Sequence, residues 1–539
     1  MKISSAVRPW LGLIAIALGV ALIVVDTTIV NVIVPSIIDD IGVNSVQAQW
    51  IQESYAIILA ALLLLVGRVA DIVGARRVFL IGVLIFGASS LLAGVASTPH
   101  VLIAARFAQG AGAAMILPTS LSLLNAAFTG DARNKAFAVW GSTIGAAAAV
   151  GPLLGGWLSE HFSWRWAFGI NIPLVCLILI AGLAFLDPSP RRSGRIDVVG
   201  ALLSMVGLGL LAFGLIEGRT YGWWAVRKPL TVAGWTWHSG LSPVSVALGI
   251  AIAALGAFAV RESMLSSGAD PERALMDTRL FSIDSFRNGN IATLIIGVGE
   301  FGIVAVLPLW LQFTLGYTAT QAGLALVPIA VGSLAASGVS FGLAANVSPL
   351  SLVRLGLLLE AAGLAALAFV AATSTPWWLL AAVLFVYGLG VGFATAQVTN
   401  VVLGDVPESQ SGQASGIQSA FRQLGSALGI AILTTTFFSV LQSALRRTLD
   451  GRQGAADLTR AVTDSAGGAI AGLAANPHTA YVADAARDAM TRGVTVVGYL
   501  AAGIIVVGFV ATAFIKVQAP GRPDTEVRQV RAATGRHRR

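Results

Sequence analysis

The chain has 539 residues, of which 56% are hydrophobic and only 11% are charged. Soluble domains carry about a quarter charged residues, so this composition excludes an ordinary soluble enzyme or binding domain. The formal net charge of +8 comes from basic residues scattered over short segments and a C-terminal tail, and a nucleic-acid partner would need a continuous basic stripe instead.

Fourteen apolar stretches are long enough to cross a bilayer, which takes about 20 residues of helix. The first, residues 10–33, is too long for a signal-peptide core and has no small-residue cleavage site after it, so we expect an uncleaved helix. The others are expected near 47–69, 78–97, 101–127, 136–158, 166–187, 197–217, 242–261, 289–314, 320–344, 352–373, 377–403, 412–441 and 494–516.

Short loops with an excess of Lys and Arg face the cytoplasm in membrane proteins. The basic loops here hold Arg68, Arg76 and Arg77, then Arg133 and Lys135, then Arg191, Arg192 and Arg195. The first outer loop instead holds Asp39 and Asp40. We therefore expect both termini inside, although Arg446 and Arg447 fit an outer loop over 442–493 less well.

The two ends of the chain resemble each other. The stretch Gln109–Gly112, followed by a polar turn and a Gly-rich span, recurs as Tyr387–Gly390, a polar turn and another Gly-rich span. Such weak repetition is common in transporters built from two halves. Spans seven and eight are then an insertion between the halves, and tryptophans in their outer loop suit a membrane interface.

Energy for active transport comes from nucleotide hydrolysis or from a coupled ion gradient. A phosphate-binding loop needs a Gly-Lys pair, and none of the four lysines follows a glycine. Cys176 is the only cysteine and the five histidines lie far apart, so we expect no metal site and no cofactor. A secondary carrier remains, or a membrane protein that does not transport.

Ionisable residues inside spans are costly, by at least about 2.5 to 3.5 kcal/mol on insertion scales, and usually serve a function. Asp26, Arg106, Glu300 and Glu360 lie within predicted spans, and Glu53 lies closer to an outer edge. Each could instead form a structural ion pair or reach toward the membrane surface. Asp26 and Arg106 fall at nearly the same depth below the outer surface.

Several motifs resemble the fourteen-span drug:proton antiporter branch of the major facilitator superfamily. The similar segments are Asp26–Pro35 in span one, Gly67–Arg77 between spans two and three, Arg106–Gly110 in span four, Gly145 to Gly156 in span five, Trp164–Pro173, and Ser411–Gly425. In the second of these, Ile72 and Ala75 stand where the family usually has arginine. The resemblance covers nearly the whole chain.

The resemblance implies an all-α integral membrane protein with two six-helix bundles around a central cavity and two extra central helices. The expected divisions are an N-terminal bundle over 1–187, an insertion over 188–287, a C-terminal bundle over 288–516 and a basic tail over 517–539. Proton coupling is expected at Asp26, Arg106 and Glu300, and the cavity is expected to add Gln109, Gln397 and Asn400. The conformational lock is expected at Gly67, Asp71, Gly74, Arg76 and Arg77, and the antiporter motif at Gly145, Gly151, Pro152, Gly155 and Gly156.

The leading hypothesis is a monomeric secondary transporter in a bacterial cytoplasmic membrane. It would export amphipathic organic compounds in exchange for protons, with no enzymatic activity and no nucleic-acid partner. The alternatives are an exporter of an endogenous metabolite, siderophore or lipid, and a receptor or scaffold that does not transport. The last would leave the intramembrane charges and the half-to-half repeat unexplained.

Overall fold

The computed structural model of the protein describes residues 7–43, 45–189, 194–232, 235–268, 273–343, 347–452 and 454–514. The helices of the first half are α1 (Arg8–Ile41), α2 (Ser45–Val73), α3 (Ala75–Gly94), α4 (Pro99–Ala127), α5 (Gly130–His161), α6 (Trp166–Gly169), α7 (Asn171–Phe185), α8 (Val198–Tyr221) and α9 (Pro243–Ser267). The second half holds α10 (Asp284–Phe313), α11 (Ala319–Leu343), α12 (Pro349–Val370), α13 (Trp377–Gly404), α14 (Ser411–Thr448), α15 (Ala455–Asp464), α16 (Ala469–Ala475) and α17 (Ala480–Ala511).

Fourteen of these helical segments are long and apolar enough to span a membrane, which confirms the predicted fold class. Helix starts carry local signals: the side chains of Thr98, Asp197, Ser242 and Ser348 accept hydrogen bonds from the first turns of α4, α8, α9 and α12. Span six runs as one apolar stretch over Trp166–Phe185, in which α6 and α7 are separated only by Ile170, itself in a helical conformation. The basic residues Arg191 and Arg192 and the tail 517–539 lie outside the described residues.

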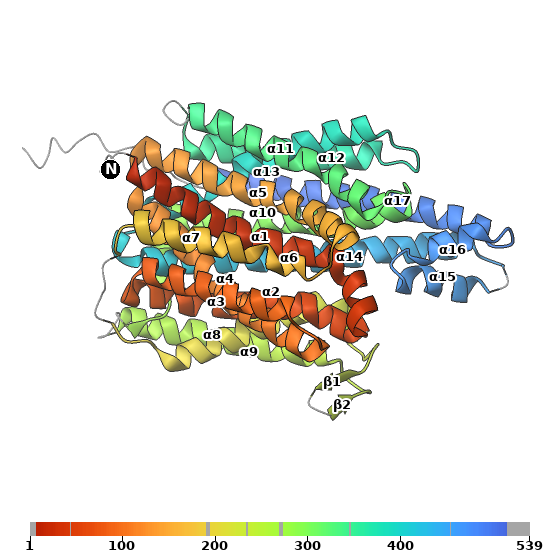
Figure 1. The fold of residues 1–539 in the computed structure, drawn as a ribbon, viewed down its shortest axis with the longest axis horizontal. Helices are drawn as coiled ribbons and strands as arrows, with labels where there is room; N and C mark the ends of the chain where they lie inside the picture. The colour runs from red at the N-terminus through yellow and green to blue at the C-terminus, as the bar shows by residue number, and fades with distance from the viewer. Residues whose placement is uncertain are drawn as a thin grey trace, which may run out of the picture.

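The predicted outer loop 442–493 is largely helical. Helix α14 continues to Thr448 and α17 begins at Ala480, so both extend past the apolar stretches that mark the spans. Between them α15 and α16 project beyond the other helices at one end of the molecule (Figure 1). The short antiparallel strands β1 (Leu230–Val232) and β2 (Trp235–Trp237) lie at the same end. We call this end the outer face and the opposite end, which carries Asp71 and Asp405, the inner face, after the predicted orientation.

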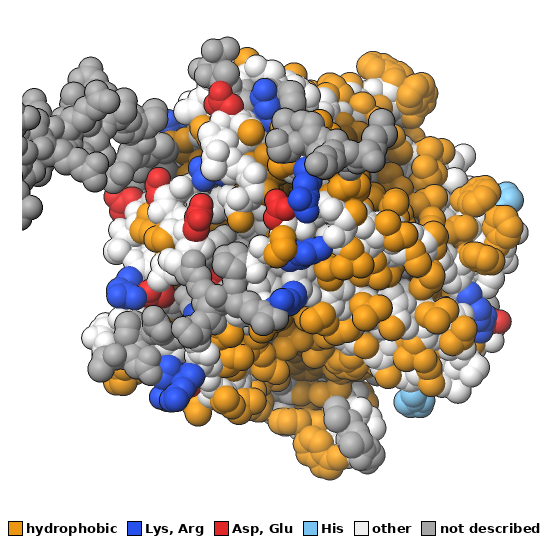
Figure 2. All heavy atoms as spheres, turned by 60° about the vertical axis from the view of Figure 1, so that its left-hand side comes forward, with side chains coloured by type: hydrophobic (Ala, Val, Ile, Leu, Met, Phe, Trp, Pro, Cys, Tyr) orange, Lys and Arg blue, Asp and Glu red, His pale blue; other side chains and the backbone are white. Residues whose placement is uncertain are grey.

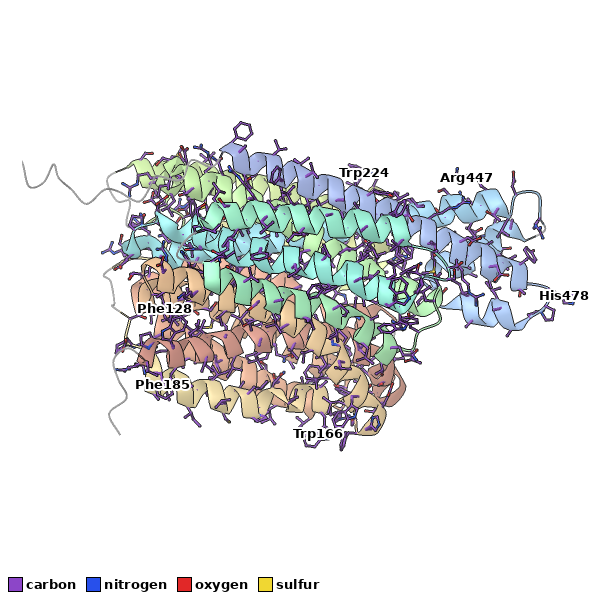
Figure 3. All side chains as sticks on the ribbon, turned by 90° about the horizontal axis from the view of Figure 1, so that it is seen from above. Phe128, Trp166, Phe185, Trp224, Arg447 and His478 are labelled. Atoms are coloured by element: carbon purple, nitrogen blue, oxygen red, sulfur yellow. The ribbon has the colours of Figure 1, made fainter. Side chains whose placement is uncertain are left out.

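The long helices run roughly parallel between the two faces (Figure 1). Charged side chains gather on the inner face, and a broad hydrophobic surface covers the side beside it (Figure 2). Phe128 and Phe185 mark the inner ends of two spans, while Trp166 lies toward the outer end and His478 at the outer tip (Figure 3). This distribution is that of a protein whose sides contact lipid and whose ends contact water.

The halves meet along a few helices. Helix α5 packs against α11 and α13, and α2 packs against α14. The inserted helices α8 and α9 pack against each other, and α8 also packs on α2 and α14. The inserted pair therefore stands beside the α2–α14 boundary, in contact with both halves.

Candidate functional site

A polar cluster is buried inside the first half around Asp26 of α1. Arg106 of α4 forms an ion pair with Asp26, and the exposed fractions of the two side chains are 1% for Arg106 and 0% for Asp26. Gln109, one turn along α4, donates to the second carboxylate oxygen of Asp26 at 3.1 Å, and Asn171 of α7 donates to the same oxygen at 3.0 Å. Helices α1, α4 and α7 thus converge on one carboxylate.

Further hydrogen bonds fix the orientation of these side chains. Ser90 of α3 accepts from Gln109 and from Asn171 at 2.8 and 3.2 Å. Arg106 donates to the carbonyl oxygen of Ile51 at 3.0 Å, and its guanidinium lies 4.5 Å from the ring centroid of Tyr55. A buried ion pair is tolerated when hydrogen bonds satisfy its remaining atoms, and this pair meets that condition on five helices.

A second buried ion pair lies in the other half. Glu300 of α10 pairs with Arg422 of α14 at 3.2 Å, and Thr395 of α13 donates to the same carboxyl at 3.4 Å. Glu360 of α12 is fully buried, and neither of its oxygens has a hydrogen-bond partner. Its carboxyl lies near Glu300, since a Cβ atom on the adjacent Gly299 would stand 3.3 Å from it.

The other predicted cavity residues lie deeper toward the inner face. Gln397 of α13 donates to Ser340 of α11 at 2.7 Å. Asn400, also on α13, donates to Asn134 of α5 at 2.5 Å and so joins the two halves. The predicted site is therefore divided: Asp26, Arg106 and Gln109 form one cluster, Glu300 belongs to a second, and Gln397 and Asn400 lie in a third, all buried in this conformation.

The predicted lock lies at the inner face. The two carboxylate oxygens of Asp71 accept from the backbone amides of Gly412 and Gln413 at 2.8 and 2.9 Å. These amides open α14, whose own N-cap residue makes no capping bond, so an acid of the first half caps a helix of the second. Arg76 instead donates to the Leu183 carbonyl at 2.7 Å, and Arg77 donates to that of Val73 at 3.5 Å.

Small residues let the halves approach beside Asp71. A Cβ atom on Gly67 would stand 2.6 Å from the carbonyl oxygen of Gly412, closer than real contacts allow. Gly74, at the turn into α3, has φ +101°, a conformation that favours glycine. A cavity of about 320 Å³ opens next to this contact, lined by Asp71, Ser122 and Ser411 among others.

The predicted antiporter motif lies on α5 and faces two neighbours. Gly151 and Gly155 press against Thr28 and Ile29 of α1, and Gly145 presses against Ser333 of α11 in the other half. Gly156 lies near Thr320 of α11, whose hydroxyl also donates to Glu160 at 3.1 Å. Pro152 lies within the helix between these contacts. The glycines thus place α5 between α1 and the second half.

At the outer face Asp40 joins the end of α1 to α6. Arg165 forms an ion pair with its carboxylate, and the indole of Trp164 donates to it at 3.0 Å. The hydrogen bond from Arg165 and then that from Trp164 lower the pKa of Asp40 below its ordinary value. The contact lies outside the apolar part of span one, so Asp40 stays ionised at neutral pH.

Comparison with known proteins decides the family. The sequence profile of the Major Facilitator Superfamily matches residues 16–430. The chain belongs to the Major Facilitator Superfamily. It is 34% identical to the puromycin resistance protein of Streptomyces alboniger over 79% of this chain and 82% of that protein. It is 31% identical to the multidrug efflux pump LfrA of Mycolicibacterium smegmatis over 92% of this chain and 94% of that protein.

The fold comparison agrees with this membership. The solved structure of the human organic anion transporter MFSD10 superposes with a TM-score of 0.60, covering 94% of this chain and 99% of that chain at 13% identity. The major facilitator proteins are transporters and not enzymes, so this chain is a multi-pass membrane transporter. The predictions of a transport protein and of the family are confirmed.

Sequence reasoning missed several residues of the two clusters. Arg422 lies well inside the predicted span 412–441, so the rule that flags intramembrane charges could have singled it out. Asn171 and Ser90 are neutral polar residues in apolar spans, and their type alone gives a weaker signal. Among the described residues, no three His, Cys, Asp or Glu side chains gather as metal ligands.

Proposed function

We propose that this transporter exports small amphipathic organic compounds across the cytoplasmic membrane in exchange for protons. Its similarity to a puromycin resistance protein and to a multidrug efflux pump supports this substrate class. Export of an endogenous metabolite, a siderophore or a lipid is the alternative, and it would use the same coupling. Both termini would lie in the cytoplasm, and a monomer would suffice because the ion-pair clusters are completed within one chain.

The observation that carries the proposal is the position of Asp26. It is a carboxylate with no exposed surface, yet its two oxygens are held by Arg106, Gln109 and Asn171 from two other helices. While the guanidinium stays in contact, it balances the negative charge of the carboxylate. If α1 and α4 move apart, the isolated carboxylate takes up a proton, since an unpaired buried charge is costly.

This exchange couples to transport through alternating access. An incoming cation or a helix movement that displaces Arg106 would change the proton affinity of Asp26, and proton uptake from outside would reset it. Glu300 and Arg422 form a comparable pair in the second half, so each half contains a carboxylate that can exchange its partner. The Asp71 contact with α14 would hold the inner face closed during the outward-open part of the cycle.

The test uses purified protein in liposomes with an acidic interior and with ethidium and puromycin as probes. Asp26→Asn has the size of the protonated acid but cannot release a proton, so accumulation against a gradient should be lost while probe binding and downhill exchange remain. Asp40→Asn is the matched control, since it removes an acid of the same helix that lies in the outer ion pair. Uphill accumulation at the wild-type rate by Asp26→Asn would refute the role of this residue.

A further inference from the structure

Two carboxyl groups meet at the outer end of the boundary between α2 and the inserted helix α8. Glu53 of α2 and Glu217 of α8 face each other there, beside the ring contact of Trp50 with Phe213 that joins the two helices. Each stands close to the outer end of its span, which begins at Trp50 for α2 and ends at Tyr221 for α8. Glu53 belongs to the first half of the chain, whereas Glu217 belongs to the inserted pair α8 and α9.

Three of the four carboxyl oxygens of the pair are buried without a hydrogen-bond partner. Glu217 has an exposed fraction of 0%, and neither of its oxygens has a hydrogen-bond partner. One oxygen of Glu53 is likewise buried without a partner, and so is the hydroxyl of Tyr221, one turn from Glu217. A buried acceptor without a donor costs about 1 to 3 kcal/mol, and more when it is charged.

The surroundings of the pair are aromatic. Trp50 stacks on Phe213 at 6.2 Å between ring centroids, and Phe213 stacks on Tyr221 at the same distance. The nearby cations are held elsewhere: Arg106 by Asp26, and Arg219 by the Thr463 carbonyl and the Phe438 ring of the second half.

Helices α9 and α14 also pack on α8, and their charged residues lie at other depths or bond to other groups. Helix α9 carries only Arg261 and Glu262, which lie at its inner end. On α14, Arg422 pairs with Glu300 near the membrane interior, and Arg447 at the outer end bonds to the Ser443 carbonyl; its neighbour Arg446 is exposed. Arg227, whose backbone amide donates to the Tyr221 carbonyl at 2.9 Å, has an exposed side chain.

We propose that Glu53 and Glu217 share one proton and form a proton-binding site that joins the inserted helices to the first half. Two ionised carboxylates that face each other in an apolar setting would repel, whereas a single proton supplies a donor for their unpartnered oxygens. The proton binds one carboxylate oxygen and is shared with the facing one, so the pair carries one negative charge in place of two. A metal ion would need more oxygen ligands than this aromatic surrounding provides.

The site would make docking of α8 on α2 depend on the proton concentration at the outer face. With the proton bound, the inserted pair is held against the first half, and α8 reaches the second half through Arg219. With the proton lost, repulsion between the two carboxylates loosens the α2–α8 contact. This inference goes beyond the proposed export cycle and holds whether or not Asp26 couples transport.

Infrared difference spectroscopy of the full-length protein in lipid nanodiscs, titrated from acidic to alkaline pH, tests the proposal. The wild type should lose a protonated-carboxyl band as the pH rises, and Glu217→Gln should lack that band. Glu53→Gln should lack the same band, and the double variant should lose no more than either single variant, because one proton is shared. Glu160→Gln, which removes an exposed acid at the same face, should keep it.

Three results would overturn the proposal. The first is a spectrum of Glu217→Gln that retains every protonated-carboxyl band of the wild type. The second is the loss of two separate, additive bands in the double variant, which would mean two independent acids. The third is the absence of any titrating carboxyl band in the wild type. Because each glutamate is replaced separately, a folding failure of one variant leaves the other to decide.

Discussion

The two buried ion pairs differ in how completely their charges are satisfied. Asp26 receives donors from Arg106, Gln109 and Asn171, all within 3.1 Å. Glu300 has Arg422 at 3.2 Å and a longer bond from Thr395 at 3.4 Å, with the unpartnered Glu360 close by. The second cluster therefore holds two acids against one base, and its stability depends strongly on Arg422.

Replacing Arg422 with alanine should lower the free energy of unfolding by about 3 to 5 kcal/mol, because it leaves the buried Glu300 carboxylate without its cation. Adding Glu300→Gln should recover much of this loss, since the neutral amide removes the unpaired charge. Chemical denaturation in detergent measures both effects. If the double variant were as unstable as Arg422→Ala alone, the pair would not be the reason for the loss.

At the level of single residues, the sequence predicted the pair of Asp26 and Arg106 but not the pair of Glu300 and Arg422. Counting residues from the span ends put Asp26 and Arg106 at equal depth, and the structure places them in contact. The same counting cannot pair Glu300 with Arg422, because it says nothing about which spans are neighbours. Asn171 and Glu217 were missed because their importance arises from what faces them across a helix boundary.

At the scale of helices, close approach between α2 and α14 depends on glycine. Gly67 lies against Gly412 and Gly416, and Asp71 caps α14 one turn further along. The loop after the inserted pair reinforces this contact. The side-chain amide of Gln413 donates to the Ala274 carbonyl at 3.0 Å, and the side-chain amide of Gln410 donates to the Asp277 carboxylate at 2.5 Å. Burial opposes but does not outweigh the hydrogen bonds from Arg279, so the pKa of Asp277 lies below its ordinary value.

Gly67→Ala should therefore open the inner face, because its methyl group would stand 2.6 Å from the Gly412 carbonyl oxygen. A cysteine placed at the buried position Ser415, in a Cys176→Ser background, should react faster with a maleimide added at the inner side. Gly338→Ala on α11 is the control, since nothing lies within 4 Å of its Cβ position. Equal labelling rates in the two variants would contradict the role assigned to this contact.

Asp71→Asn should act in the same direction with a smaller effect. The amide oxygen can still accept one bond from the start of α14, but the charge that favours a helix N-terminus is lost, a change worth about 0.3 to 2 kcal/mol. The same labelling assay measures it, with the rate expected between those of the wild type and Gly67→Ala. A rate identical to that of the wild type would show that the carboxylate does not hold the inner face closed.

At the scale of the whole molecule, most of the fold follows from the length of the apolar stretches in the sequence. Each of the fourteen predicted stretches corresponds to a helical span, because a bilayer demands continuous apolar helix and leaves little freedom. The helices α15 and α16 and the extra turns of α14 and α17 escaped prediction, since they stand in water, where helices mix polar and apolar residues. The packing of α8 on both halves was equally out of reach, because apolar length carries no information on neighbours.

The central claim is that substrate leaves in exchange for protons, and one measurement tests it most directly. Purified protein is placed in liposomes that contain a pH-sensitive dye and an acidic interior, and ethidium or puromycin is added outside. Proton release from the interior and accumulation of the probe above its outside concentration should rise together, and both should stop when an ionophore abolishes the pH gradient. Accumulation that persists without the gradient, or that proceeds without proton release, would contradict proton-coupled export.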